Sequence, residues 1–288
     1  MTGVRSRVGA VAVASLLATA TVGCSPAEEP VDDLEAWSEG LREVAARTSS
    51  VSSVTVADGR AAVLAGDEKG HRSWDLVDMG AATGADTRRA PQVTWDAVDG
   101  EAVLRDATGL AGTCDDSRVQ VDLLSPDLTV TSLHCDGARP PQPADKVLLR
   151  GDEVPDVRRL DAAERWDLIL ALGRWLDADF RAELIEVTPS RIAIHGVASG
   201  CRMALSVTGS DRPVTWACTS ASPVLSFGVR DWDARRLLEL QQAAMADGDI
   251  TSTGALEVRV APDVRSRTMV MTASAHGSSG RVTLPKTP

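Results

Sequence analysis

The sequence predicts an α+β protein, built from antiparallel sheets of hairpins that are packed by a few amphipathic helices. Several segments carry apolar residues at helical spacing, and many shorter ones alternate apolar and polar residues between turns rich in Gly, Pro and Asp. Four cysteines outside the N-terminal leader fall as two neighbouring pairs along the chain. Together these observations predict two halves of similar size, each with one disulfide.

The first half is expected to open with a helix and a hairpin. Asp32 and Glu35 have the spacing of a capping box, which predicts that the helix begins at Asp32. One face of this helix is apolar and carries Leu34, Trp37, Leu41, Val44 and Ala45. Residues Val51 to Val63 then predict a hairpin, because Asp58-Gly59 is a strong two-residue turn signal.

The stretch that follows is polar and rich in glycine. Residues 66–90 predict a loop, which is either a binding edge or a solvated connection. A second hairpin is expected, from Gln92–Trp95 and Ala102–Arg105, with its turn at Asp99-Gly100.

Two further strands, Val119–Leu123 and Leu128–Leu133, are separated by the turn residues Ser125-Pro126-Asp127. From Asp136 to Asp156 the chain loses periodicity and gains proline, which is typical of a linker. The predicted organisation is therefore a signal peptide at 1–23, a lipidated cysteine and spacer at 24–31, an N-terminal half at 32–140, a linker at 141–158 and a C-terminal half at 159–288. The alternative is a long excursion within one continuous fold.

The second half opens with the clearest helix of the chain. Asp161 and Glu164 repeat the capping-box spacing. The helix is apolar around most of its circumference, with Trp166, Ile169, Leu170, Leu172, Trp175 and Leu176. This pattern predicts a central buried helix.

Antiparallel strands are expected after this helix. Ala182–Val187 and Arg191–Val197 form a hairpin, and the next hairpin turns at Gly209-Ser210. That turn predicts three cross-strand pairs, which are Leu205 with Val214, Met203 with Trp216, and Cys201 with Cys218. Pro213 cannot donate a ladder hydrogen bond, so it indicates an edge strand or a turn widened to Thr208–Asp211.

The last part of the chain predicts one more helix and a meander. Asp231 is the expected cap of the helix, and Leu237, Leu238 and Met245 are expected to face inward. The meander strands are Ala255–Ala261, Met269–Ala275 and Arg281–Leu284. Each half thus has a helix, then hairpins and a cysteine pair, so a duplicated module is a hypothesis. Unequal spacing speaks against it, since 82 residues separate Asp32 from Cys114 and 40 separate Asp161 from Cys201.

The four cysteines Cys114, Cys135, Cys201 and Cys218 fit an oxidising compartment. Four cysteines allow three pairings, and proximity in the sequence favours Cys114–Cys135 and Cys201–Cys218. None of them has CxxC spacing, which argues against a redox or zinc site.

The first 24 residues form an export leader. Arg5 and Arg7 are followed by the apolar run from Val8 to Val22, whose 15 residues are too few to span a membrane. Thr21-Val22-Gly23-Cys24 resembles the lipobox of bacterial lipoproteins, although Thr21 stands where that family usually has Leu. The resemblance implies that Cys24 is diacylated and anchors the protein to the outer, extracytoplasmic face of the cell membrane. The alternative is an ordinary secreted protein with a spare cysteine.

Composition limits the partners. The formal charge of −11 becomes −13 once Arg5 and Arg7 are removed with the leader, which argues against a nucleic-acid partner. Arginine outnumbers lysine 27 to 3, and tyrosine and asparagine are absent, which indicates the codon bias of a GC-rich, actinobacterial genome.

A search for catalytic and metal motifs yields no candidate. The sequence has no GxSxG elbow, and its histidines, His71, His134, His195 and His276, lack metal-site spacing. The acidic clusters Asp96/Asp99/Glu101 and Asp247/Asp249 lack the spacing of a calcium loop. We therefore expect no enzyme activity, no cofactor and no metal.

The sequence favours a lipid-anchored envelope protein that works by binding. Its expected partner is an envelope protein, or an amphipathic ligand held between a helix and a sheet. Two alternatives are an interaction module without a small ligand, which predicts a filled core, and a hydrolase, which predicts a histidine beside a carboxylate and a hydroxyl in a cleft.

Overall fold

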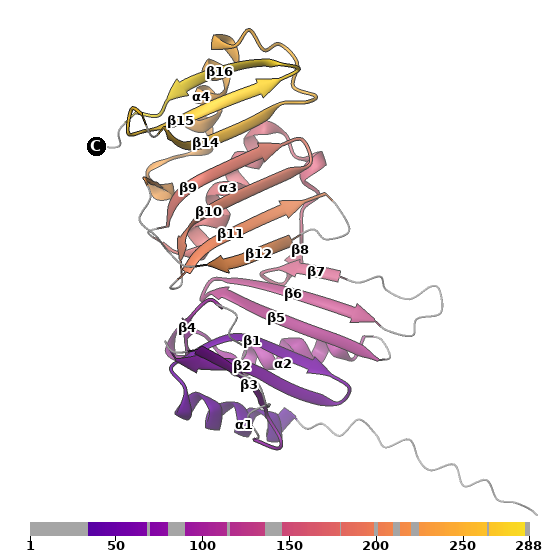
Figure 1. Cartoon of the computed structure of the whole chain (residues 1–288). Coiled ribbons are helices and arrows are strands. Elements are labelled where there is room, and N and C mark those ends of the chain that lie inside the picture. The colour runs from indigo at the N-terminus through magenta and orange to yellow at the C-terminus, as the bar shows by residue number, and fades with distance from the viewer. Residues whose placement is uncertain are drawn as a thin grey trace, which may run out of the picture. The chain divides into compact units, whose positions relative to one another are not determined.

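Each half of the chain folds into one antiparallel sheet with helices packed against it (Figure 1). The computed structural model describes residues 34–67, 70–79, 90–113, 116–135, 146–178, 180–198, 201–209, 214–219, 225–263 and 265–285. These residues form four α-helices and two eight-stranded sheets, which confirms the predicted α+β class and the two similar halves. The leader, with Arg5, Arg7 and Cys24, lies outside the described residues.

The first half runs from α1 to β8. Its elements are α1 (Leu34–Arg47), β1 (Ser50–Ala57), β2 (Arg60–Asp67), β3 (Gly70–Asp75), β4 (Val93–Thr94), the 3₁₀ turn η1 (Trp95–Ala97), α2 (Gly100–Ala111), β5 (Ser117–Ser125), β6 (Leu128–Cys135), β7 (Lys146–Leu149) and β8 (Asp152–Glu153). The strand order is β3-β2-β1-β5-β6-β7-β8, and the short β4 pairs with β1.

The second half runs from η2 to β16. Its elements are η2 (Val157–Arg159), α3 (Ala162–Leu176), β9 (Arg181–Thr188), β10 (Arg191–Ala198), β11 (Cys201–Thr208), β12 (Val214–Thr219), β13 (Phe227–Gly228), η3 (Val229–Asp231), α4 (Ala234–Asp247), β14 (Glu257–Asp263), β15 (Thr268–Ala275) and β16 (Ser278–Thr283). The strand order is β12-β11-β10-β9-β14-β15-β16, and β13 pairs with β9.

The two halves are repeats of one topology. The order β3-β2-β1-β5-β6-β7 of the first sheet matches β11-β10-β9-β14-β15-β16 of the second. β1, β2 and β3 begin at residues 50, 60 and 70, and β9, β10 and β11 begin at 181, 191 and 201, which is 131 residues later in each case. This agreement supports the duplication hypothesis. The unequal spacing of the cysteines does not contradict duplication. The residue that corresponds to Cys201, at the start of β11, is Gly70 at the start of β3, so the cysteines of the two halves are not at matching positions.

The repeats also share an irregularity. Ser52 is an extra residue in β1, since Val51 pairs with Ala65 and Ser53 with Leu64. Glu183, 131 positions after Ser52, is the extra residue in β9. A β-bulge bends its strand and raises the local twist. Both sheets are therefore bent at the same place.

Apolar side chains fill the space between the helices and each sheet. In the first half, Trp37, Leu41 and Val44 of α1 are buried, as its predicted face requires. In the second half, the predicted residues of α3 are buried except Trp175, which is partly buried.

The second core extends into the first sheet. It takes in Leu124, Leu128, Val130 and Leu149, and the hydroxyl of Ser125 donates a hydrogen bond to the carbonyl of Trp175. Residues from 32 onward accordingly form a single compact unit.

Aspartate caps position three of the helices. Asp99 accepts a hydrogen bond from the Ala102 amide at 2.9 Å and starts α2, so the predicted hairpin at Gln92–Arg105 is wrong. An Asp-Gly pair serves equally as a turn or as a helix start, and here Leu104 and Ala107 are buried at helical spacing.

The other two caps give one confirmation and one correction. The capping box of Asp161 and Glu164 is present as predicted. Asp233 rather than Asp231 caps α4, accepting from the Arg236 amide at 2.7 Å. Asp231 belongs to the 3₁₀ turn η3, which lies between β13 and the cap residue Asp233. Asp32 lies outside the described residues, so the first predicted capping box stays a prediction.

Two segments predicted as loops contain strands. β3 lies within the polar stretch 66–90 and pairs with β2, and residues 80–89 lie outside the described residues. β7 and β8 lie within the predicted linker 141–158, and β7 pairs with β6. Short polar strands at a sheet edge show little alternation of apolar and polar residues. The proline and glycine residues around them obscure this alternation further.

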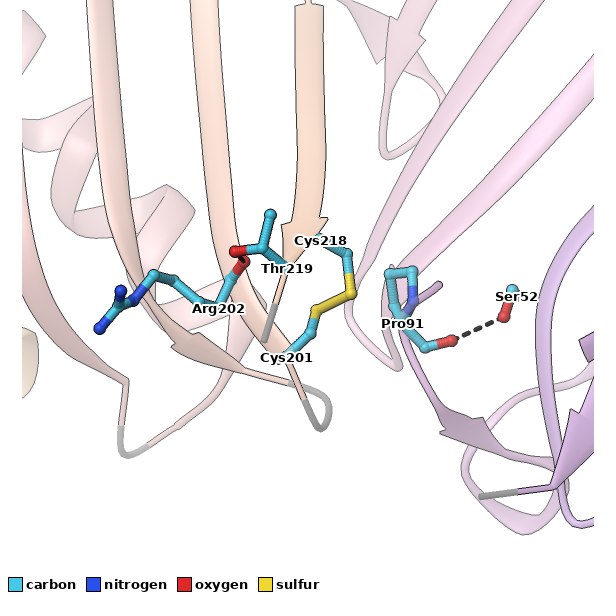
Figure 2. The surroundings of a disulfide bond; sticks show 6 residues. All are labelled: Ser52, Pro91, Cys201, Arg202, Cys218 and Thr219. Carbon is cyan, nitrogen blue, oxygen red and sulfur yellow. Dashed lines mark hydrogen bonds between the residues drawn. A yellow bond between two sulfur atoms is a disulfide. The ribbon is translucent and has the colours of Figure 1, made fainter. Parts of the chain in front are cut away.

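The Cys201–Cys218 disulfide joins β11 to β12 and has a Cα–Cα distance of 5.5 Å. The predicted register of this hairpin is wrong by two residues, because Leu205 pairs with Trp216 and Met203 with Cys218. A two-residue shift keeps every side chain on its predicted face. The two cysteines are therefore diagonal neighbours and still form their bond (Figure 2).

Several other predictions can be compared directly with the structure. The hairpin turning at Asp58-Gly59, the β9–β10 hairpin and the closing meander are confirmed. β12 is an edge strand, as Pro213 indicated, although Pro213 itself lies outside the described residues. Cys135 is disulfide-bonded, but Cys114 lies outside the described residues, so the Cys114–Cys135 pair stays a prediction. Within the described chain, no helix is both long and apolar enough to cross a membrane.

Candidate ligand-binding cleft

A polar cleft of about 520 Å³ opens on the first sheet. We call it the polar cleft and define it by its lining residues, which are Ser52, Ser53, Thr55, Ala62, Leu64, Ser73, Ala90, Gln120, Asp122, Trp216, Ala217 and Cys218. This volume lies within the range of small-molecule sites in proteins.

The floor of the cleft consists of two rows of cross-strand neighbours. Ser73, Leu64, Ser53 and Asp122 form one row across β3, β2, β1 and β5. Ala62, Thr55 and Gln120 form the next row across β2, β1 and β5. Alternate residues of a strand point to the same face, so both rows face the cleft together. The apolar residues between them, such as Val54 and Val121, belong to the core on the helix side.

The second half supplies one wall of the cleft. Trp216, Ala217 and Cys218 of β12 line it, and the Trp216 indole N–H donates a hydrogen bond to Asp122 at 3.0 Å. The disulfide to Cys201 ties this wall strand to β11. Near the disulfide, the hydroxyl of the bulge residue Ser52 donates a 2.6 Å hydrogen bond to the Pro91 carbonyl (Figure 2). This hydroxyl therefore already has a partner within the protein.

Asp122 is the charged group of the cleft. Only 9% of its surface is exposed, and its carboxylate accepts from Gln120 Nε2 at 2.7 Å as well as from Trp216. Burial raises the pKa of Asp122, although these two hydrogen bonds act in the opposite direction. A buried carboxyl with a perturbed pKa beside a cleft is a mark of functional sites.

Three hydroxyl groups of the floor have no hydrogen-bond partner among the described residues. They belong to Ser53, Thr55 and Ser73. Ser53 is 7% exposed, but none of the three hydroxyl oxygens is among the fully buried side-chain atoms that lack a partner. The three hydroxyls therefore face the open cleft, where water or a ligand can pair with them.

The second repeat differs at the same positions. Thr55 and Gln120 pair across β1 and β5, and their counterparts Glu186 and Arg259 pair across β9 and β14. Glu186 also forms an ion pair with Arg191. Charged side chains thus stand at the two positions where the first repeat has Thr55 and Gln120, while Arg60, the counterpart of Arg191, forms an ion pair with Asp75. The two repeats therefore differ at part of the cleft floor.

A second hollow of about 420 Å³ lies between α2 and strands β5–β7. Its lining mixes apolar residues, such as Val103, Leu110 and Leu148, with Arg105 and Arg150. The Arg150 guanidinium also stacks over the Trp175 ring at 4.7 Å from its centroid. The sequence predicted an amphipathic ligand between a helix and a sheet without naming the elements, and part of α2 lies in a stretch that was predicted as a hairpin.

None of the four histidines lines either hollow. His71 lies beside a hydroxyl, since its Nε2 is 3.1 Å from the Ser50 Oγ. Burial lowers the pKa of His71, while the nearby Asp67 carboxylate raises it. Both Ser50 and His71 are buried, so the pair resembles a core contact more than a hydrolase site.

The remaining candidates stay apart. His195 lies on the charged face of the second sheet, where burial lowers its pKa. His134 is in β6, and His276 is in the β15–β16 turn with φ of 49°. Within the described ranges, no three His, Cys, Asp or Glu side chains are grouped to hold a metal. Asp96, Asp99 and Glu101 lie around the start of α2, where Asp99 serves as its cap.

Sequence reasoning missed the residues that matter most here. Gln120 and Asp122 are polar positions that alternate with Val119, Val121 and Leu123 in β5, which predicts that they share one face of a strand. Ser53, Thr55 and Ser73 come from other strands, and only the strand order brings them beside Asp122.

No protein-family model matches the chain, and no curated protein matches it. Among solved structures, it is similar to the Proliferating Cellular Nuclear Antigen from Entamoeba histolytica, with 10% identity, 86% of this chain and 94% of that chain covered, and a TM-score of 0.20. A PCNA2–PCNA3 complex from Sulfolobus tokodaii has 7% identity, coverage of 88% and 96%, and a TM-score of 0.20. PCNA from Thermococcus kodakaraensis has 10% identity, coverage of 85% and 94%, and a TM-score of 0.19. Such TM-scores are too low to support any inference about this chain.

Proposed function

We propose that the protein is an exported, lipid-anchored binding protein of the cell envelope, and that the polar cleft is its ligand site. The leader pattern ending at Cys24 supports export and lipid anchoring. The Cys201–Cys218 disulfide fits the oxidising compartment that such a protein would enter.

One observation carries the binding function. The polar cleft combines a buried carboxyl, Asp122, with the unpartnered hydroxyls of Ser53, Thr55 and Ser73. Water pairs with such groups in an open cleft, and a ligand that carries hydrogen-bonding groups of its own would replace that water. The arrangement therefore favours a polar ligand.

The anchor fits this function. Two acyl chains on Cys24, at about 0.8 kcal/mol for each buried methylene group, would hold the protein stably on the membrane. The polar residues 25–31 and the charge of −13 would keep the folded part off an anionic lipid surface, which would leave the cleft open to the envelope.

The amphipathic ligand stays a second candidate, favoured by the hollow between α2 and the sheet. Its apolar residues lie beside Arg105 and Arg150, a pairing that suits an acyl chain with an anionic head group. The cores under the helices are filled, so this hollow would hold a short segment and not a whole lipid.

Native mass spectrometry tests the binding function. The folded part from Ser25 onward is purified from its own host, and extracted small molecules are identified. Near-stoichiometric co-purification of a ligand that is lost in Asp122→Asn and kept in Arg150→Ala would support the polar cleft. Loss of the ligand in Arg150→Ala alone would favour the hollow between α2 and strands β5–β7 as the site. A clean apo mass, with no saturable ligand found among envelope extracts, would contradict a binding function.

Anchoring needs its own test. In cells expressing the full chain, wild-type protein should sediment with membranes, and its N-terminal peptide should carry diacylglyceryl on Cys24. Cys24→Ser should abolish both. Soluble wild-type protein with an unmodified Cys24 would contradict the anchor and leave the cleft unaffected.

A further inference from the structure

We propose that the polar cleft binds a neutral, hydroxyl-rich ligand, of which a sugar ring is the representative chemistry. The inference rests on the proposed binding function and names its ligand class. It follows from three properties of the lining: its charge, its unpartnered groups and their layout.

The charge of the described lining disfavours ionic ligands. Among the described residues, no lysine, arginine or histidine lines the cleft, so none of them offers an anion a counter-charge. Asp122 is the only acid among the described lining residues, and it already accepts hydrogen bonds from Gln120 and Trp216. A single buried carboxyl that spends its oxygens on protein donors is a poor partner for a cation.

The polar groups of the floor exclude a purely apolar ligand. Covering Ser53, Thr55 and Ser73 with hydrocarbon would remove water from three hydroxyls without replacing its hydrogen bonds. Each protein hydroxyl both donates and accepts, and the Gln120 amide also offers both kinds of group. A ligand that carries several hydroxyls of its own matches such a lining group for group.

The layout of the lining fits a compact ring. Ser53 and Thr55 lie two residues apart on β1, opposite Asp122 and Gln120 of β5, while Ser73 of β3 lies one strand farther away, beyond Leu64 of β2. Adjacent strands are about 4.8 Å apart and alternate residues about 6.8 Å apart, so the four residues on β1 and β5 form a small grid. Leu64, Trp216 and Ala217 add apolar surface beside it, which suits the C–H groups of a sugar ring.

The second repeat provides an internal comparison. Its matching face pairs Glu186 with Arg191 and lies beside Arg259, so charged side chains satisfy one another there. In the first repeat the corresponding residues are Thr55, Arg60 and Gln120, and Arg60 forms an ion pair with Asp75. The difference between the repeats is therefore confined to Thr55 and Gln120, whose side chains are uncharged and suit a neutral polar ligand.

The test follows the Trp216 indole N–H by NMR, because this group donates to Asp122 inside the cleft. Its signal is assigned with Trp216→Phe. The folded part is titrated with D-glucose, D-galactose and D-mannose, with their methyl glycosides, and with hexylamine and octanoate as a cation and an amphipathic anion. We expect saturable shifts with at least one hexose or methyl glycoside. Binding of both forms would indicate a ring within a glycan chain, and binding of the free hexose alone would indicate a free sugar.

Matched variants locate the effect. Thr55→Val and Ser73→Ala each remove one floor hydroxyl and should weaken hexose binding about twofold to tenfold. Thr272→Val changes a half-buried threonine of the second sheet and should leave binding unchanged. Two floor variants are used in case one of them fails to fold. The chemical-shift dispersion of the NMR spectrum shows whether each variant is folded.

The outcomes separate the two proposals. Shifts with hexylamine or octanoate but with no sugar would overturn the ligand class and leave the binding function in place. Sugar shifts that Thr272→Val weakens as much as Thr55→Val would also overturn the assignment to this cleft. No shift with any probe, together with a clean apo mass from the host, would overturn both.

Discussion

At the scale of single residues, Asp122 has the most unusual environment in the cleft. Its carboxyl is buried at the meeting of the two halves and is held by one donor from each, Gln120 and Trp216. Burial opposes its ionisation more than these two neutral donors favour it, so its pKa is raised. The residue therefore links the electrostatics of the cleft to the stability of the fold.

Asp122 should make the wild-type protein lose stability as pH rises. The folded carboxyl has a pKa above the ordinary 3.8, so the folded state binds more protons than the unfolded state in the window from about 3.8 to the raised value. The free energy of unfolding should fall as pH rises through this window, and Asp122→Asn should lack that fall. Urea unfolding between pH 2 and 7 measures it.

Asp263 is the matched control, because its pKa is shifted the other way. The hydrogen bond from Arg281 lowers the pKa of Asp263 to about 2. Its contribution should be present above pH 3.8 and disappear as pH falls toward 2, so Asp263→Asn should remove an effect of opposite sign. A difference between wild type and Asp122→Asn that stays constant over the whole range would contradict the first prediction.

Two helical glycines should respond to alanine in opposite ways. A Cβ on Gly40 of α1 would lie 2.0 Å from the Leu76 carbonyl oxygen, which is backbone and cannot move aside. Gly40→Ala should cost about 1–3 kcal/mol of unfolding free energy. A Cβ on Gly109 of α2 meets no atom within 4 Å, so Gly109→Ala should gain about 0.5–1 kcal/mol. Thermal unfolding compares them, and equal effects would show that the close approach of α1 to Leu76 is wrong.

At the scale of elements, local signals predicted most helices and hairpins but not the pairing between distant ones. The α3 capping box and the Asp58-Gly59 turn are local, and both are confirmed. Asp99-Gly100 fits either a hairpin turn or a helix start, and the helix forms because it buries Leu104 and Ala107 in the core. The cleft was not predicted, because its rows join β1, β2, β3 and β5, whose order is a tertiary property.

The disulfide should matter for β12 more than for the rest of the second sheet. Cys201 and Cys218 are separated by 17 residues, and closing a loop of that size contributes about 3 kcal/mol in the chain-entropy model. The double variant Cys201→Ser/Cys218→Ser should therefore lose about this much free energy of unfolding, measured in urea. It should also broaden or shift the Trp216 indole signal, since Trp216 lies in the strand that is set free.

The closing meander is the control for this prediction. Amide exchange in β15 should stay slow in the double variant while exchange in β12 becomes faster. Equal loss of protection in both strands, or no loss in either, would contradict a local role of the bond.

At the scale of the whole molecule, each repeat has its own apolar core, and the core of the second half extends into the first sheet. Leu124, Leu128, Val130 and Leu149 leave the first sheet to pack with the core of the second half. Within the described part of the predicted linker, residues 146–158, Leu149 and Val157 are buried. Sequence reasoning recognised two halves from their local patterns, but burial across their junction depends on which residues meet in space.

The two halves should consequently unfold together. We expect a single calorimetric transition for the folded part, with agreement between the calorimetric and van't Hoff enthalpies. Leu128→Ala, at a fully buried position of the first sheet, should lower the unfolding free energy by about 2–5 kcal/mol and shift that one transition.

An exposed residue gives the comparison for Leu128. Val77 is 53% exposed, and Val77→Ala should change the unfolding free energy by less than about 0.5 kcal/mol. Two resolved transitions in the wild type, of which Leu128→Ala moves only one, would refute the coupling of the two halves through the second core.

The covalent tie between β11 and β12 has a consequence for timing. If the protein is exported as proposed, its disulfide forms outside the reducing cytosol, so β12, which carries Trp216, is joined to β11 only after the chain has crossed the membrane. Inside the cell, the precursor would have its leader and its sheets, but β12 beside Asp122 would lack the disulfide to β11. Ligand capture would then begin only after translocation and oxidation, which would keep the precursor from sequestering cytosolic compounds before export.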